Sequence, residues 1–128
     1  MKLLLSGTLA LVTLGSFSAL AECPKLEGEY GCMISADRVD TLRVKRSENA
    51  GVTFYSLSYA DGSGADSFKA SAAGVRDDFG WMNSCTPDHR LVSVLRDGSA
   101  TAAIYLNTKR AWVREYNGAV VQTCWRQK

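Results

Sequence analysis

A tight hairpin near the end of the chain is the feature that most constrains its fold. Residues 109–126 read KRAWVREYNGAVVQTCWR, so that Asn117-Gly118 separates two runs rich in β-branched and aromatic side chains. Asn-Gly favours a type I′ turn between antiparallel strands, because both turn positions need a positive φ angle. The sequence therefore predicts a two-residue turn, and such a turn fixes the register of the two strands.

Counting outward from this turn assigns every hairpin side chain to one face of a sheet. The expected pairs are Tyr116 with Ala119, Arg114 with Val121, and Trp112 with Thr123. Opposed residues share a face. One face is then expected to carry Trp112, Arg114, Tyr116, Val121 and Trp125, and the other Val113, Glu115, Val120, Gln122, Cys124 and Arg126. The first face is aromatic with one cation inside it, which indicates a sheet that encloses a core or a ligand.

Short extended runs fill the rest of the chain at regular intervals. Asp97-Gly98 predicts a second tight hairpin, whose register places Leu91, Ser93, Leu95, Ala100, Ala102, Ile104 and Leu106 on one face. The small residues of this face leave room beneath a sheet. We expect strands over 27–34, 41–46, 52–59, 67–72, 80–86, 91–96, 100–106, 110–116 and 119–126, with a linker around 74–78.

Successive hairpins at this spacing are typical of an all-β fold. The predicted architecture is an antiparallel up-and-down meander of eight or nine strands in a single domain over residues 22–128. A meander this long either closes into a barrel or stacks as two sheets, because isolated edge strands are a liability. We favour a closed or nearly closed, disulfide-bonded barrel.

Residues 1–21 have the pattern of a secretory signal peptide. Lys2 precedes an apolar run from Leu3 to Leu20, and the segment ends in Ala19-Leu20-Ala21. An uncleaved membrane anchor is the alternative, but Gly7, Thr13 and other small or polar residues dilute the run. We therefore expect an extracytoplasmic protein, periplasmic or secreted, with no stable membrane anchor after cleavage.

The charge balance after removal of this segment is close to neutral. It leaves 14 Lys and Arg against 13 Asp and Glu. Nucleic-acid binding requires clustered basic residues to neutralise phosphates. The densest basic group, at 43–46, alternates like the solvated face of a strand, so no nucleic-acid partner is expected.

The four cysteines, Cys23, Cys32, Cys85 and Cys124, all follow the expected cleavage point. An even number of cysteines in an exported domain indicates two disulfides. If 27–34 is a strand, the extended chain between Cys23 and Cys32 separates them by more than a disulfide allows, unless a turn at Pro24 or Gly28 folds the segment back. We expect each of these two to bond to one of the last two. With His89 as the only histidine, no metal site and no cofactor are predicted.

The beginning and the end of the predicted barrel carry a family pattern. Gly28-Glu29-Tyr30 on the first strand resembles the Gly-x-aromatic opening of the calycins, the group of lipocalin, avidin and fatty-acid-binding barrels. In that group the opening aromatic residue packs near a basic residue of the last strand, which here would pair Tyr30 with Arg126. The resemblance implies a cup that binds a small, largely apolar ligand.

Arg114 is the clearest candidate for a functional residue. Burial of an unpaired cation among aromatic rings is costly, so its guanidinium either receives a ligand carboxylate or phosphate, or stacks on those rings or pairs with an internal acid. If this face is the outside of the sheet, Arg114 is merely solvated. His89 lies in a loop, and no catalytic constellation is recognisable, so no enzyme is predicted.

Two functions remain open from the sequence. The first is a non-enzymatic binding barrel that holds a small apolar molecule beneath Tyr30, Trp112, Arg114, Tyr116 and Trp125. The second is a protein-interaction module, for example an inhibitor of another extracytoplasmic protein, which presents the loops at 61–66 and 86–90 on a rigid scaffold. An apolar cavity favours the first, and a packed interior with an exposed aromatic patch favours the second.

Overall fold

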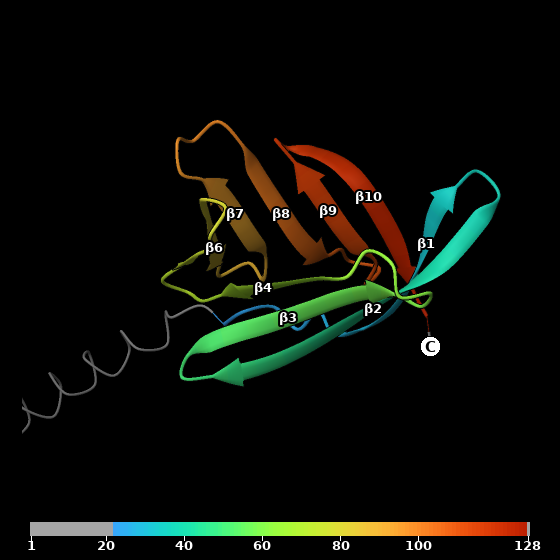
Figure 1. Cartoon of the computed structure of the whole chain (residues 1–128), viewed down its shortest axis with the longest axis horizontal. Helices are drawn as coiled ribbons and strands as arrows, with labels where there is room; N and C mark the ends of the chain where they lie inside the picture. Colours follow the sequence, from blue (N-terminus) through green and yellow to red (C-terminus); the bar gives the residue numbers. More distant parts are fainter. Residues whose placement is uncertain (1–21, 128) are drawn as a thin grey trace, which may run out of the picture.

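The computed structural model describes residues 22–127 as one antiparallel sheet of ten strands (Figure 1). The strands are β1 (Gly28–Ser35), β2 (Arg38–Asn49), β3 (Val52–Tyr59), β4 (Asp66–Ala70), β5 (Val75–Arg76), β6 (Trp81–Cys85), β7 (Leu91–Leu95), β8 (Thr101–Leu106), β9 (Trp112–Tyr116) and β10 (Ala119–Arg126). The all-β meander is confirmed. The additional strand is β5, a two-residue segment where the sequence predicted only a linker. The signal-peptide prediction falls on residues 1–21, outside the described part of the chain.

The order of the strands shows how the meander becomes a barrel. It runs β4-β3-β2-β1-β10-β9-β8-β7-β6-β5, so that the first and last strands pair with each other and the sheet curls back on itself. Figure 1 shows β2 to β4 below and β6 to β10 above, and β1 joins these two groups. Among residues 22–127, no helix is long and apolar enough to cross a bilayer.

The barrel is nearly closed where β4 approaches β6. Ser71, just after β4, forms a parallel bridge with Ser84, and its carbonyl accepts a hydrogen bond of 2.9 Å from the backbone N–H of Cys85. A second contact joins β4 to β6, because the Asn83 side chain donates a hydrogen bond to the Lys69 carbonyl at 3.0 Å. Within residues 22–127, scattered contacts of this kind join β4 to β6 in place of a continuous ladder of hydrogen bonds.

The hydrophobic core fills the closed end of the barrel. Tyr30 and Trp112 are fully buried, with ring centroids 5.8 Å apart, and Tyr55 and Leu91 pack in the same cluster. The segment before β1 covers this end with Leu26, which is also fully buried. Side chains of β1, β2 and β3 hold that segment through its carbonyl groups: Tyr30 Oη donates to Leu26 at 2.8 Å, Arg46 Nη2 to Cys23 at 3.2 Å and Tyr55 Oη to Pro24 at 2.6 Å.

Two disulfides connect distant parts of the chain. Cys23 bonds to Cys85 across 62 residues, and Cys32 bonds to Cys124 across 92 residues. Each of the first two cysteines therefore bonds to one of the last two, as predicted. Such bonds persist in oxidising compartments, which indicates an environment outside the reducing cytosol.

A β-bulge in β10 overturns part of the predicted hairpin register. Tyr116 pairs with Ala119 as predicted, but the register shifts between Val120 and Gln122. The observed pairs beyond the shift are Arg114 with Gln122, Val113 with Thr123 and Trp112 with Cys124, in place of Arg114 with Val121 and Trp112 with Thr123. One additional residue reverses the alternation of every side chain that follows it.

The correction concerns the last five residues of β10. Gln122, Cys124 and Arg126 share the inward face with Trp112, whereas the prediction placed them on the opposite face. Trp125, predicted to lie beside Trp112, points outward and is 46% exposed. The register of the Asp97-Gly98 hairpin needs no such correction, because Leu91 pairs with Ile104 as predicted.

Candidate ligand-binding site

An open cavity of about 810 Å³ lies between β4 and the concave face of β6 to β10. Most of its surface is apolar, although about half of the lining residues are polar or charged. The apolar side chains include Phe68, Trp81, Leu91, Ala102, Ile104 and Val121. A concave and mainly apolar pocket of this size is typical of sites for small molecules.

Small side chains at the centre of the sheet create this space. Ser93 of β7 pairs with Ala102 of β8, and both line the cavity. Ala102 also pairs with Tyr116 of β9 on its other side. Because neither Ser93 nor Ala102 reaches far from the sheet, the interior above the core stays open, as the sequence predicted for this face.

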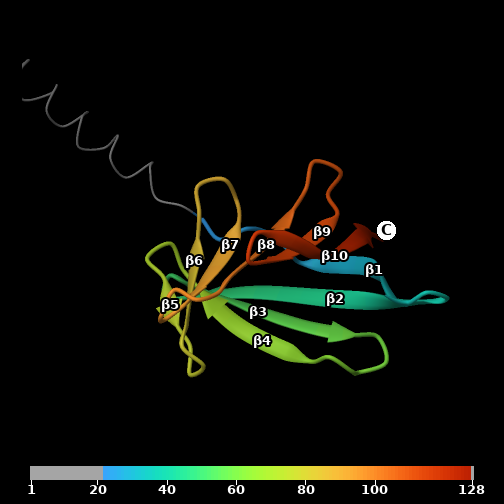
Figure 2. The same ribbon diagram turned by 90° about the horizontal axis from the view of Figure 1, so that it is seen from above.

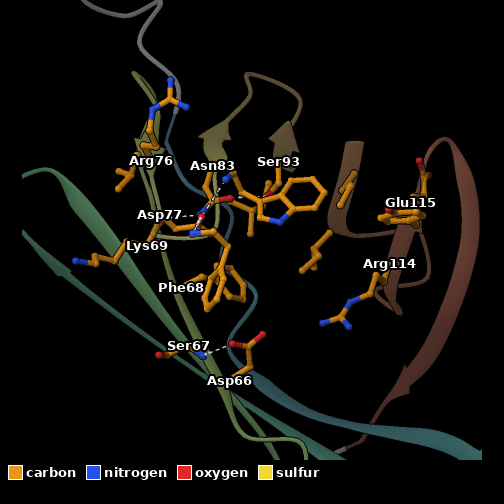
Figure 3. Close-up of a pocket in the computed structure, with 18 of the residues that line it drawn as sticks. Asp66, Ser67, Phe68, Lys69, Arg76, Asp77, Asn83, Ser93, Arg114 and Glu115 are labelled. Atoms are coloured by element: carbon orange, nitrogen blue, oxygen red, sulfur yellow. Dashed lines mark hydrogen bonds between the residues drawn. The ribbon is translucent and has the colours of Figure 1, made fainter. Parts of the chain in front are cut away.

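Arg114 of β9 projects into the cavity. The inward side chains of β9 are Trp112, Arg114 and Tyr116, and they run from the closed end to the rim. Figure 3 shows the Arg114 guanidinium directed into the open space from the wall opposite Phe68. Within residues 22–127, Arg114 has no ion pair, no side-chain hydrogen bond and no stacked aromatic ring. Within the described residues, Arg114 therefore neither stacks on the aromatic rings nor pairs with an internal acid, which were the two structural roles considered for it.

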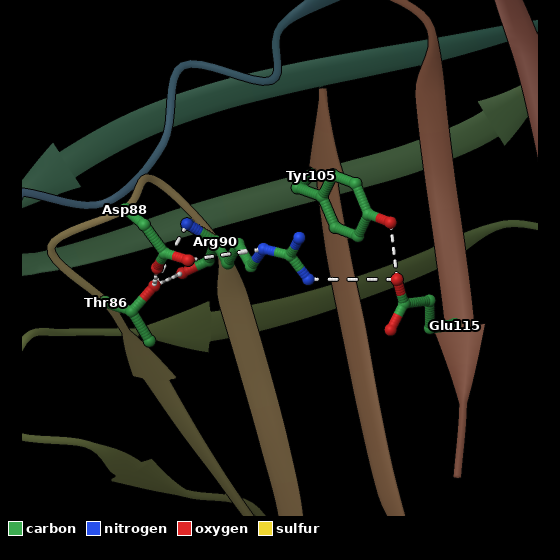
Figure 4. A network of polar contacts seen from close by, with 5 residues as sticks. All are labelled: Thr86, Asp88, Arg90, Tyr105 and Glu115. Atoms are coloured by element: carbon green, nitrogen blue, oxygen red, sulfur yellow. Dashed lines mark hydrogen bonds and ion pairs between the residues drawn. The ribbon is translucent and has the colours of Figure 1, made fainter. Parts of the chain in front are cut away.

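The acid next to Arg114 in the chain is engaged on the other side of the sheet. Glu115 accepts a hydrogen bond from the Tyr105 hydroxyl, and its carboxylate lies 3.7 Å from Arg90 Nη1 (Figure 4). The Arg90 guanidinium also stacks on the Tyr105 ring at 3.9 Å, and its Nε lies 3.4 Å from Asp88. This network holds the Glu115 carboxylate away from Arg114, and hydrogen bonding to that carboxylate raises the pKa of Tyr105.

Two of the acids at the edge of the cavity, Asp66 and Asp77, are also occupied by local contacts. Asp66 Oδ1 accepts the backbone N–H of Ser67 at 2.8 Å. Asp77 Oδ1 accepts the backbone N–H groups of Phe79 and Trp81, both at 2.9 Å, and so orders the turn before β6. These carboxylates stabilise turns and do not neutralise Arg114.

Asn83 is the most deeply buried polar side chain in the wall. Its Nδ2 donates to the Lys69 carbonyl and its Oδ1 accepts from Ser93 Oγ at 2.7 Å. Both ends of the amide are thereby satisfied, which a buried amide requires. Asn83 thus joins β4, β6 and β7 at the back of the cavity, and the Ser93 hydroxyl keeps acceptor capacity towards the interior.

The structure divides the five residues predicted for the site. Arg114 and Tyr116 line the cavity, with Tyr116 48% exposed at the rim. Tyr30 and Trp112 are packed in the core of the closed end, where Arg126 Nη1 donates to the Tyr30 hydroxyl at 3.1 Å. Trp125 lies on the outer surface. The five side chains therefore do not form one continuous surface.

Phe68 and Trp81 are two of the lining residues that the sequence reasoning missed. Phe68 stacks on Tyr55, with ring centroids 5.3 Å apart, and Figure 3 shows it facing the cavity. Trp81 shares the inward face of β6 with Asn83 and Cys85. The pairing of Cys85 with Leu91 could have indicated this face, because Leu91 was already expected on the inner side.

Comparison with protein-family models, with curated proteins and with solved structures gave no match to this chain. Within residues 22–127 there is no group of three side chains that could hold a metal ion. The chemistry of the site is therefore argued from its own residues.

Proposed function

We propose that this protein is a non-enzymatic binding barrel for a small, largely apolar molecule that carries an anionic group. The observation that carries the proposal is the unpaired guanidinium of Arg114 inside a mainly apolar cavity of about 810 Å³. An anionic head would pair with Arg114, and the rest of the molecule would contact Phe68 and Trp81.

The electrostatics of the cavity support an anion in particular. A charge-assisted hydrogen bond to arginine is about twice as strong as a neutral one, and a planar guanidinium matches a carboxylate in two-point contact. The attraction is larger in a partly desolvated cavity than in water. Since none of the lining acids Glu115, Asp66, Asp77 and Asp78 forms an ion pair with Arg114 in the described part of the chain, the ligand would supply the counter-charge.

The open cavity is also the reason to prefer a binding barrel to an interaction module. The same proposal includes the finer assignments made from the sequence, namely a calycin-like relationship and export to the periplasm or the exterior. The hydrogen bond between Tyr30 and Arg126 supports the first, because it joins the opening aromatic residue to the last strand. The two disulfides support the second.

Ligand titration monitored by tryptophan fluorescence tests the proposal, because Trp81 lines the cavity. The probes are dodecanoate and dodecanol, which share the same chain but differ in charge. We expect dodecanoate to change the emission and to bind at least about tenfold more weakly to Arg114→Met, since a charge-assisted contact contributes about 1.5–3 kcal/mol. Dodecanol should bind the two proteins equally.

Arg96→Met is the matched control, because Arg96 is an exposed arginine in the turn after β7 and does not line the cavity. It should bind dodecanoate as the unchanged protein does. No response to dodecanoate or to the fluorescent anion 1-anilinonaphthalene-8-sulfonate would contradict the proposal, and so would equal loss of both dodecyl probes in Arg114→Met.

A further inference from the structure

The first and last strands of the barrel separate soon after they pair. β1 and β10 are in register only at Tyr30 with Arg126 and Gly31 with Trp125. The Cys32–Cys124 disulfide lies next to these pairs, with 4.6 Å between the Cα atoms. Beyond it, β1 continues with β2 into a hairpin that projects from the rest of the sheet (Figures 1 and 2). Residues 119–123 of β10 therefore keep one edge without a partner strand in the described chain.

This edge lacks the usual protection against strand pairing. Natural edge strands carry charged side chains or proline, which prevent association with another chain. Residues 117–125 contain no charged residue and no proline. The same holds for residues 30–35 of β1, which diverge from β10, and we call the region between these two segments the fork. The bulge between Val120 and Gln122 adds local twist, which protects this part of the edge only in part.

Exposed apolar side chains gather on the two arms of the fork. Val120 and Val121 of β10 are each 58% exposed. The projecting hairpin exposes Met33, Ile34 and Val39. The unpaired backbone edge of β10 and the exposed apolar side chains thus occur at the same place. These are two separate observations.

We propose that this fork is a docking surface for a second copy of the same chain. The β10 edges of the two copies would pair as antiparallel strands about a twofold axis. Each projecting hairpin would pack Met33, Ile34 and Val39 against the other copy. An antiparallel edge is self-complementary, because the donors and acceptors of one copy meet those of the other. Since residues 117–125 are uncharged, two copies meet without like-charge repulsion.

The oligomeric state of the purified, disulfide-bonded protein tests this proposal. We expect sedimentation equilibrium up to about 500 µM to show a monomer–dimer equilibrium. Val120→Lys should weaken the association at least about tenfold, because a lysine on the edge protects it and two lysines repel near the axis. Val120 does not line the cavity, so dodecanoate binding should not change and the two proposals are tested separately.

Val94→Lys is the control, because Val94 is an exposed valine on β7, a strand that has partners on both sides. It should associate as the unchanged protein does. Hydrogen exchange on the unchanged protein gives a second measurement that needs no variant: the amides of 119–123 should exchange more slowly as the concentration rises. A monomer at every concentration, equal association of Val120→Lys, or equal loss in Val94→Lys would overturn the proposal.

Discussion

Arg126 Nη1 donates a 3.1 Å hydrogen bond to the hydroxyl of Tyr30, so the last strand contacts the first inside the closed end of the barrel. The same hydroxyl donates to the Leu26 carbonyl at 2.8 Å. Tyr30 therefore links three segments: the cover of the closed end, β1 and β10.

Tyr30→Phe should lower the free energy of unfolding by about 1–3 kcal/mol, because the Leu26 carbonyl then loses its donor in a buried place. Urea unfolding followed by circular dichroism measures the change. Tyr116→Phe is the control, since the Tyr116 hydroxyl has no hydrogen bond within the described residues, and it should change stability by less than about 0.5 kcal/mol. Equal effects of the two substitutions would contradict this role of Tyr30.

Gly31 is the second position at which β1 and β10 depend on each other. A Cβ atom at Gly31 would meet the indole of Trp125 at 2.5–2.7 Å. Gly31→Ala should displace this indole and lower stability by about 1–3 kcal/mol, as overpacking does. The Trp125 emission should shift at the same time.

The same substitution in a Trp125→Ala background separates contact from backbone effects. If the clash is the cause, Gly31→Ala should cost much less there, and the two changes should be clearly non-additive. Additive costs would show that the glycine is needed for another reason.

Asn83 joins the seam between β4 and β6. Asn83→Leu keeps a similar volume but leaves the Lys69 carbonyl and the Ser93 hydroxyl without their partner, so we expect a loss of about 2 kcal/mol. Amides of β4 should exchange faster, because fewer contacts then hold this edge. Ser56→Ala, on the exposed face of β3, should leave exchange in β4 unchanged.

Tyr55 makes the free energy of unfolding depend on pH in the alkaline range. Burial raises the pKa of Tyr55 from 10.0 to about 12, although the neighbouring Arg46 opposes the shift. Between these two pH values the folded protein binds more protons than the unfolded chain, so the free energy of unfolding falls as the pH rises. This contribution is fully present below pH 10 and is lost as the pH passes 12.

Tyr55→Phe should remove the Tyr55 part of this slope. Because the Pro24 carbonyl loses its donor, the variant should also be less stable at neutral pH by about 1–2 kcal/mol. Urea unfolding at several pH values up to 11.5 measures both effects. Burial also raises the pKa of Tyr30, so some alkaline slope should persist. An unchanged slope in Tyr55→Phe would contradict the assignment.

Local patterns in the sequence specify the parts of the fold that depend on neighbours in the chain. Asn117-Gly118 and Asp97-Gly98 specify turns, alternation marks most of the strands, and chain length between Cys23 and Cys32 limits the disulfide pairing. These features act over a few residues, where turn chemistry and side-chain alternation dominate.

Which residues of the last hairpin share the interior depends on contacts between distant parts of the chain. The bulge between Val120 and Gln122 reverses the faces of β10, so that Cys124 lies on the inner face, where it bonds to Cys32. The cavity likewise depends on β4, which meets β6 only after the whole sheet has curved. Alternation already places Arg114 and Glu115 on opposite faces, but the contacts of Glu115 with Tyr105 and Arg90 depend on the pairing of neighbouring strands. Such contacts join residues far apart in the chain, and local patterns do not encode them.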